Sequence, residues 1–169
     1  MRNVFLLFFC ILLVACGKER HWPAEISSCS GCSTEEKGSV SSFVTDLNAK
    51  SGSNLISMSE SENKTQFAIT VRFVEGAEIQ ESGDSKNTRA GLATVYIDHC
   101  DVQLSKDLHK AENAQYFKAV LWHEMGHCAG LEHDNSEEEI MFAVTKKFPA
   151  YTEDAITRFI NKFKQSAKL

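Results

Sequence analysis

The most constraining feature of this 169-residue chain is the segment 123–133, which reads HEMGHCAGLEH. His123 and His127 are four residues apart, so on a helix they share one face and can offer two imidazole nitrogens to one metal ion. Glu124, one step around the helix, is placed to touch a water bound to that ion. The spacing therefore predicts a helical zinc site of the hydrolytic type.

A hydrolytic zinc takes three protein ligands and keeps a fourth position for water. His133 lies six residues beyond His127 and can be the third ligand only if the helix ends and the chain turns back. Gly130 stands where such a turn needs a residue with positive φ. We therefore expect His123, His127 and His133 as ligands, and Glu124 as the base that takes a proton from the water and passes it to the leaving group.

These residues, together with Ile140-Met141 eight positions after His133, resemble the metzincin metalloproteases and within them the matrixin-like branch. Two positions depart from the matrixin pattern. Asp134 stands where matrixins usually have Ser, and Ala143 stands where some metzincins place a Tyr near the metal. The second departure leaves the additional oxyanion donor unassigned.

The resemblance implies a fold, a methionine turn and an activity. The implied fold is α+β: a twisted, mostly parallel sheet with an antiparallel edge strand, an active-site helix and a C-terminal helix. Met141 is expected to pack beneath the metal ligands, and the implied activity is zinc-dependent endopeptidase cleavage of a protein or peptide substrate. Matrixins often bind structural zinc and calcium in an upstream loop. Residues 75–91 show no matching ligand spacing, although Asp84 and Asp98 could hold calcium.

The N-terminus predicts export. One positive charge at Arg2 precedes an apolar run from Val4 to Val14, which is too short to span a membrane comfortably. The run ends in Leu-Val-Ala-Cys, which resembles a bacterial lipobox with Cys16 as the lipidated first residue of the mature chain. The alternative is an ordinary signal peptide with a coincidental cysteine. Gly17 is not the Asp typical of inner-membrane retention, so we expect the outer membrane.

These features divide the chain into a signal peptide over 1–15, a polar lipid-anchored tether over 16–33 and a protease domain over 34–169. About 150 residues suit one domain with one core.

The formal net charge of −5, with no concentration of basic residues, argues against a nucleic-acid partner. A monomer is expected.

Four cysteines remain beyond the signal and the anchor: Cys29, Cys32, Cys100 and Cys128. An even number in an exported protein indicates disulfides, although four cysteines allow three pairings. The pair 29 and 32 also fits a redox motif or half of a metal site. Our first choice joins 29 with 32 and 100 with 128.

Hydrophobic periodicity predicts the remaining elements. Val40, Phe43, Val44 and Leu47 recur at helical spacing before Gly52, and Thr152 can cap a final helix with apolar residues at 156, 159, 160 and 163. Strand alternation is expected over 67–73 and again over 92–98, where Ala93, Val95 and Ile97 would share one face. The segments 51–61 and 75–89 read as loops. A helical stripe runs from Ala114 to Cys128.

Two other function classes fit parts of the pattern. One is a lipid-anchored binding or structural envelope protein with a non-catalytic zinc site, and such a site would most readily lose Glu124, which is present. The other is a small periplasmic metal carrier, which would show more histidines than this chain has. His21, His99 and His109 are expected to be surface residues.

Overall fold

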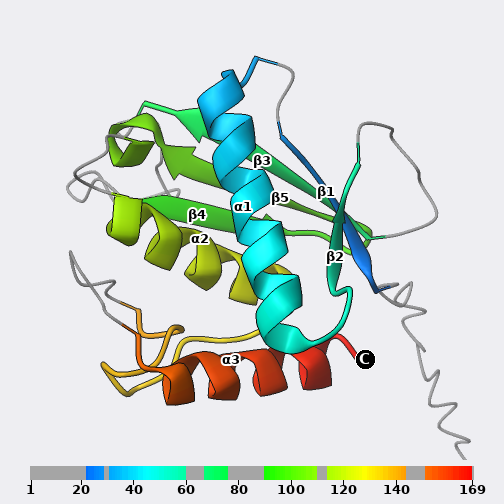
Figure 1. Cartoon of the computed structure of the whole chain (residues 1–169), viewed down its shortest axis with the longest axis vertical. Helices are drawn as coiled ribbons and strands as arrows, with labels where there is room; N and C mark the ends of the chain where they lie inside the picture. Colours follow the sequence, from blue (N-terminus) through cyan, green and yellow to red (C-terminus); the bar gives the residue numbers. More distant parts are fainter. Residues whose placement is uncertain are drawn as a thin grey trace, which may run out of the picture.

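The computed structural model describes residues 22–28, 31–59, 67–75, 90–109, 114–143 and 151–168. Within them the chain forms a sheet flanked by helices (Figure 1). In chain order the elements are β1 (Ala24–Ser28), α1 (Thr34–Ser51), β2 (Ile56–Met58), β3 (Ala68–Val74), β4 (Gly91–Val95), β5 (His99–Ser105), the 3-10 helix η2 (Lys106–His109), α2 (Ala114–Cys128) and α3 (Glu153–Ser166).

The sheet has the strand order β2-β1-β3-β5-β4. β1 pairs in parallel with β2 and β3, and β3 pairs in parallel with β5. β4 lies at one edge and runs antiparallel to β5. A tight hairpin joins these two strands, closed by the Tyr96 N–H donating to the His99 carbonyl at 2.9 Å. The predicted fold class, a mostly parallel sheet with an antiparallel edge strand, is confirmed.

One face of the sheet is covered by helices. Side chains of β3 alternate between buried Ile69, Val71 and Phe73 and more accessible Thr70 and Arg72, as expected when only one face meets the core. The helices α1 and α2 pack on the buried face, and α3 crosses beneath them (Figure 1).

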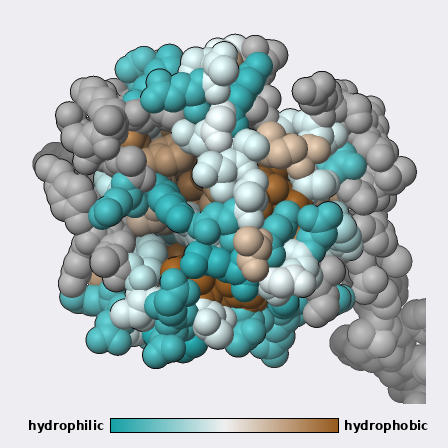
Figure 2. All heavy atoms as spheres, viewed as in Figure 1, coloured by the Kyte–Doolittle hydropathy of each residue, from teal (hydrophilic) through white to brown (hydrophobic). Residues whose placement is uncertain are grey.

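Aromatic side chains join the three helices. Phe43 of α1 meets Trp122 of α2 edge-on at 5.6 Å, and Trp122 meets Phe159 of α3 at 5.4 Å between ring centroids. All three are nearly inaccessible to solvent. The outer surface around α1 is mostly hydrophilic, with hydrophobic atoms showing in the recesses beside it (Figure 2). Helix packing therefore holds α2 firmly against the sheet.

Local sequence signals set the ends of α1 and α3. Ser33 and Glu36 form a capping box, in which the Glu36 N–H donates to Ser33 Oγ at 3.2 Å and the Ser33 N–H donates to Glu36 Oε2. Gly52 ends α1 with a φ of 64°, as expected for a left-handed C-terminal residue. Thr152 caps α3 by accepting from the Ala155 N–H at 3.1 Å. The predictions for these helices are confirmed.

The predicted tether over 16–33 is wrong for part of its length. Residues Ala24–Ser28 form β1, which lies between β2 and β3, and Ala24 and Ile26 are fully buried. A five-residue strand with three polar members carries little hydrophobic signal of its own. Its neighbours on both sides make it a strand, and the folded domain therefore includes residues assigned to the tether.

Three further strand predictions need correction. β2 lies inside the predicted loop 51–61, and β5 was not predicted at all. The predicted strand 92–98 ends at Val95, where the chain turns into the hairpin. Ile97, expected to share a strand face with Ala93 and Val95, lies beyond the strand at that turn and is 64% exposed.

In the parts of the chain that the structure describes, no helix has the length and apolar character needed to cross a membrane.

Candidate metal centre and catalytic site

The C-terminal end of α2 shapes the site. α2 ends at Cys128, and Gly130 follows with a φ of 90°. The Leu131 N–H donates to the Gly126 carbonyl at 2.9 Å, and the Gly130 N–H donates to the His127 carbonyl at 2.8 Å. These two bonds form a Schellman motif, with glycine at its left-handed position. The motif reverses the chain and brings His133 back to α2, as the sequence predicted.

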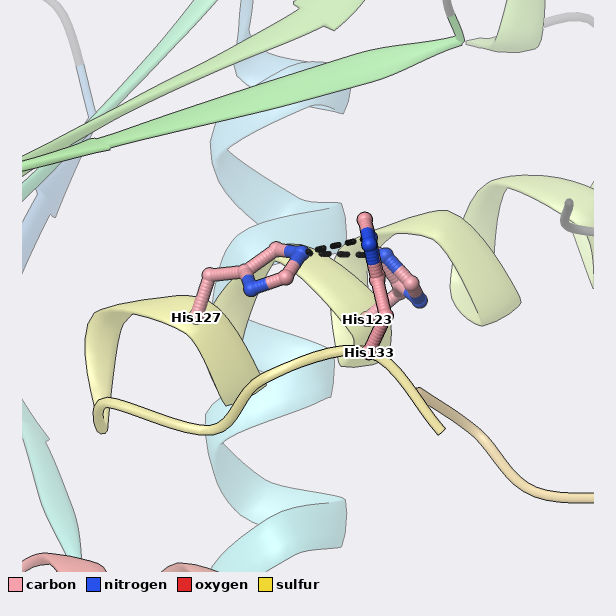
Figure 3. A group of neighbouring side chains, drawn as sticks. All are labelled: His123, His127 and His133. Carbon is pink, nitrogen blue, oxygen red and sulfur yellow. Dashed lines mark hydrogen bonds between the residues drawn. The ribbon is translucent and has the colours of Figure 1, made fainter. Parts of the chain in front are cut away.

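The three histidines meet on one side of α2 (Figure 3). Nε2 of His127 lies 3.1 Å from Nε2 of His123 and 3.2 Å from Nε2 of His133. His123 is buried and His133 is exposed, so the cluster opens to solvent on the His133 side. Within the described ranges, this is the one group of three or more His, Cys, Asp or Glu side chains arranged to hold a metal ion.

Backbone carbonyls fix the tautomers of two of these histidines. Nδ1 of His123 lies 2.8 Å from the Ile140 carbonyl, and Nδ1 of His127 lies 2.9 Å from the Leu131 carbonyl. A carbonyl only accepts, so each Nδ1 carries the hydrogen and each Nε2 presents a lone pair. Two lone pairs at this separation repel one another unless a cation lies between them. The arrangement is that of a metal site with its outer partners in place.

Electrostatics keep the same imidazoles neutral. Burial lowers the pKa of His123 to about 4, against an opposing hydrogen bond with Ile140, and neighbouring His127 and His133 lower it further. Burial also lowers the pKa of His127. Neutral imidazole is the form that binds metal, so the site is prepared for a cation at neutral pH.

The donor set fits zinc. Zinc–nitrogen bonds of 2.0–2.1 Å at tetrahedral angles separate two ligand nitrogens by about 3.3 Å. The separations of 3.1 and 3.2 Å are close to that value. Three imidazoles with an open side match a catalytic site, because a structural zinc site has four protein ligands.

Met141, which the resemblance places beneath the metal ligands, packs against Gly126, the residue before His127 on α2. It is buried, and a β-carbon at Gly126 of α2 would collide with its sulfur. The same turn supplies the Ile140 carbonyl to His123, and the Met141 carbonyl accepts from the Asp134 N–H at 2.8 Å. The methionine turn therefore supports both ends of the ligand set.

Asp134 connects the chain next to His133 with α3. Its identity departs from the matrixin pattern. Its Oδ2 lies 2.7 Å from Lys162 Nζ, and its Oδ1 accepts from the Ser136 N–H at 3.1 Å. The hydrogen bond with Lys162, assisted by the Ser136 N–H, lowers the pKa of the Asp134 carboxyl. Sequence analysis missed this contact, because no local signal links residues 28 positions apart.

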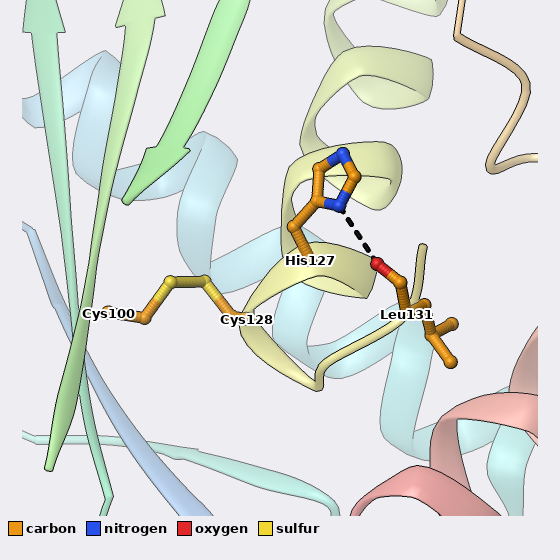
Figure 4. Close-up of a disulfide and its surroundings, with 4 residues drawn as sticks. All are labelled: Cys100, His127, Cys128 and Leu131. Atoms are coloured by element: carbon orange, nitrogen blue, oxygen red, sulfur yellow. Dashed lines mark hydrogen bonds between the residues drawn. A yellow bond between two sulfur atoms is a disulfide. The ribbon is translucent and has the colours of Figure 1, made fainter. Parts of the chain in front are cut away.

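The predicted pairing of Cys100 with Cys128 is present (Figure 4). The disulfide joins β5 to the last residue of α2, directly beside His127. The predicted pairing of Cys29 with Cys32 involves a residue outside those described. Cys16, His21 and Asp84 also lie outside the described residues.

The other polar candidates stay apart from the site. His99 stacks on Tyr96 with ring centroids 4.2 Å apart, and its Nδ1 lies 2.7 Å from Asp98 Oδ1. Asp98 is therefore paired with a histidine, and no described acidic cluster around it supports the calcium considered from the sequence. Glu124 is buried on α2 and faces β4.

Comparison with known proteins agrees with this geometry. The sequence profile of the matrixin family matches residues 35–157, more than half of the chain. The structure is similar to the crystal structure of archaemetzincin from Methanopyrus kandleri, with a TM-score of 0.55 and 11% sequence identity over 94% of this chain and 100% of that chain. At that identity the likeness concerns the fold alone. No curated protein sequence matches the chain.

Proposed function

Given that this chain belongs to the matrixin family of zinc metallopeptidases, we propose that it is an endopeptidase held at the bacterial cell envelope. The observation that carries the proposal is the convergence of three imidazole Nε2 atoms, from His123, His127 and His133, on one potential metal position. His123, His127 and His133 would hold the zinc. A zinc ion bound by three neutral imidazoles supplies Lewis acidity, which acidifies water and polarises a carbonyl.

Glu124 acts as the general base. Glu124 directly follows His123 on α2, and in this proposal its carboxylate reaches the water on the metal without being a ligand. The carboxylate accepts a proton from the attacking water and donates it to the leaving amine. His123 and His127 stay neutral because burial lowers the pKa of both imidazoles, and the backbone carbonyls keep each hydrogen on Nδ1, so that each Nε2 faces the metal position.

The edge strand β4 supports cleavage within a chain. β4 pairs with β5 on one side, and no described strand pairs with its other side. An unpaired edge offers backbone N–H and C=O groups to an extended peptide. A peptide held along this edge, beside α2, can extend past the site in both directions, which is the arrangement an endopeptidase needs.

The envelope location rests on the N-terminal sequence. The lipobox ending at Cys16 supports a lipid anchor, and Gly17 supports the outer membrane as destination. The part of 16–33 that precedes β1 is the tether in this proposal. We propose that the protein acts as a monomer.

The test of the activity uses purified protein, a mixed peptide library and a zinc measurement. The parent should contain about one zinc per chain and cleave internal peptide bonds, and a chelator should abolish cleavage. Glu124→Gln should keep its zinc and lose about 10²–10⁴-fold in kcat, the usual contribution of a positioned base. A Glu124→Gln protein that loses its zinc, or one as active as the parent, would refute the role of Glu124.

A further inference from the structure

Gly91, the first residue of β4, lies directly against the Glu124 side chain of α2. A β-carbon at position 91 would lie 2.8 Å from Glu124 Oε1, 2.9 Å from Glu124 Cγ and 2.7 Å from Val120 Cγ1. Carbon atoms in ordinary contact are about 3.5–4.0 Å apart. The Glu124 carboxylate therefore occupies space that any other residue at position 91 would fill.

The backbone conformation at position 91 does not explain why this residue is a glycine. Among described residues, the glycines with positive φ are Gly52 and Gly130, so alanine can adopt the backbone angles of Gly91. Glycine inside a strand is otherwise unfavourable, and it often marks a close approach of another group to the backbone. Here that group is Glu124.

Of the groups around Gly91, the β4 backbone and Val120 have little freedom to move. β4 is fixed by its ladder with β5, in which Gly91 pairs with Leu104, and the Ser105 N–H donates to the Ala90 carbonyl at 3.0 Å. Val120 is 1% exposed, and a β-branched side chain in a helix has one strongly preferred rotamer. The Glu124 side chain is the flexible member of the group, so an added methyl group at position 91 displaces its carboxylate.

We propose that Gly91 is a positioning residue for Glu124. Because Gly91 has no side chain, the Glu124 carboxylate can lie against β4, and this contact holds it at its working position beside the metal site. This inference rests on the proposed role of Glu124 as the base. A misplacement of about 1 Å in a reacting group can cost about 100-fold in rate. Gly91 has no side chain to take part in the reaction, and its effect passes through Glu124.

The test compares Gly91→Ala with Gly38→Ala, a control in α1 where an added β-carbon would meet nothing within 4 Å. For Gly91→Ala we expect kcat to fall about 10- to 100-fold, with KM within about twofold and zinc per chain unchanged. Gly38→Ala should match the parent in all three. A rise in KM at unchanged kcat would mean that position 91 contacts substrate instead, and loss of zinc would mean that it supports the ligands. Either result overturns the inference.

A double-mutant cycle separates this inference from the proposed function. In a Glu124→Gln background, Gly91→Ala should cause no further loss, because the group it displaces no longer acts as a base. A further tenfold loss there would overturn the inference. Equal activity of the parent and Glu124→Gln would overturn the proposed function and the inference with it. A parent that depends on Glu124 but tolerates Gly91→Ala would overturn the inference alone.

A crystal structure of zinc-loaded Gly91→Ala supplies a readout that does not depend on activity. The Glu124 carboxylate should move away from β4 while His123, His127 and His133 superpose on the parent. An unmoved carboxylate would overturn the inference. If Gly91→Ala does not fold, both measurements are made in a Val120→Ala background, where the Cγ1 contact is gone and the Glu124 contacts persist.

Discussion

Lys162 Nζ lies 2.7 Å from Asp134 Oδ2, and this contact connects the last helix to the residue that follows the third histidine of the site. Lys162 also lies 3.8 Å from Glu139 Oε2, on the segment that leads to the methionine turn. Two carboxylates from the loop around the metal site therefore share one cation on α3. The position of His133 depends on α3 as well as on the local turn at Gly130.

Removing this cation should loosen the metal site slightly. For Lys162→Met we expect zinc affinity to fall by no more than about fivefold, because an exposed ion pair contributes at most about 1 kcal/mol. Competition with a chromogenic chelator measures the affinity. Lys164→Met is the matched control, since Lys164 on the same helix donates to the Ser51 carbonyl instead. Equal affinities in the two variants would show that the contact does not support His133.

Removing His133 should damage the site far more than removing a histidine outside the cluster. His133→Ala leaves two ligands, and we expect zinc affinity to fall by more than the 10- to 100-fold typical of losing an outer partner of a ligand. Chelator titration of residual peptidase activity is the measurement. His99→Ala, which removes a ring paired with Asp98, should titrate like the parent. Indistinguishable titrations of the two variants would place the third ligand elsewhere.

Removing the disulfide should destabilise the domain. The bond between Cys100 and Cys128 closes a loop over a sequence separation of 28 residues. Chain-entropy arguments predict a loss of about 3–4 kcal/mol in the free energy of unfolding for a loop of this length. Urea unfolding of the Cys100→Ala/Cys128→Ala double variant tests this. An unchanged unfolding midpoint and slope would mean that the bond adds nothing to stability.

The Cys100→Ala/Cys128→Ala variant should also retain less zinc than the parent on dilution. The disulfide anchors the last turn of α2, which contains His127, to β5 (Figure 4). Zinc per chain after gel filtration measures this effect. The parent treated with reductant should behave in the same way.

Changing Cys16 should release the protein from the membrane. The lipobox motivates this prediction, since Cys16 is the residue that would carry the lipid. For Cys16→Ser we expect a soluble chain or an unprocessed precursor in fractionated cells, detected by blotting and by mass. Cys10→Ser, inside the predicted signal, serves as the control and should stay membrane-bound. A fully processed Cys16→Ser chain that still sediments with membranes would exclude the anchor.

The sequence alone predicted the features that depend on near neighbours. Histidines four residues apart share a helix face, Gly130 ends the helix, and His133 follows within reach, so the ligand set was readable from 11 residues. Gly52 and Thr152 set helix ends through contacts within three or four positions. The pairing of Cys100 with Cys128 was one of three possibilities, and it was chosen from the expected closeness of a strand and the active-site helix.

The tertiary structure decided the features that depend on distant partners. β1 is short and partly polar, and it becomes a buried strand because β2 and β3 pair with it on both sides. β5 alternates buried Cys100, Val102 and Leu104 with Asp101 and Gln103, a strand signal present in the sequence that we overlooked. The contacts of Lys162 with Asp134 and of Gly91 with Glu124 have no such signal. Residues on different elements are brought together only when the helices bury their apolar faces against the sheet, so the chemistry of the site could be predicted locally while its support could not.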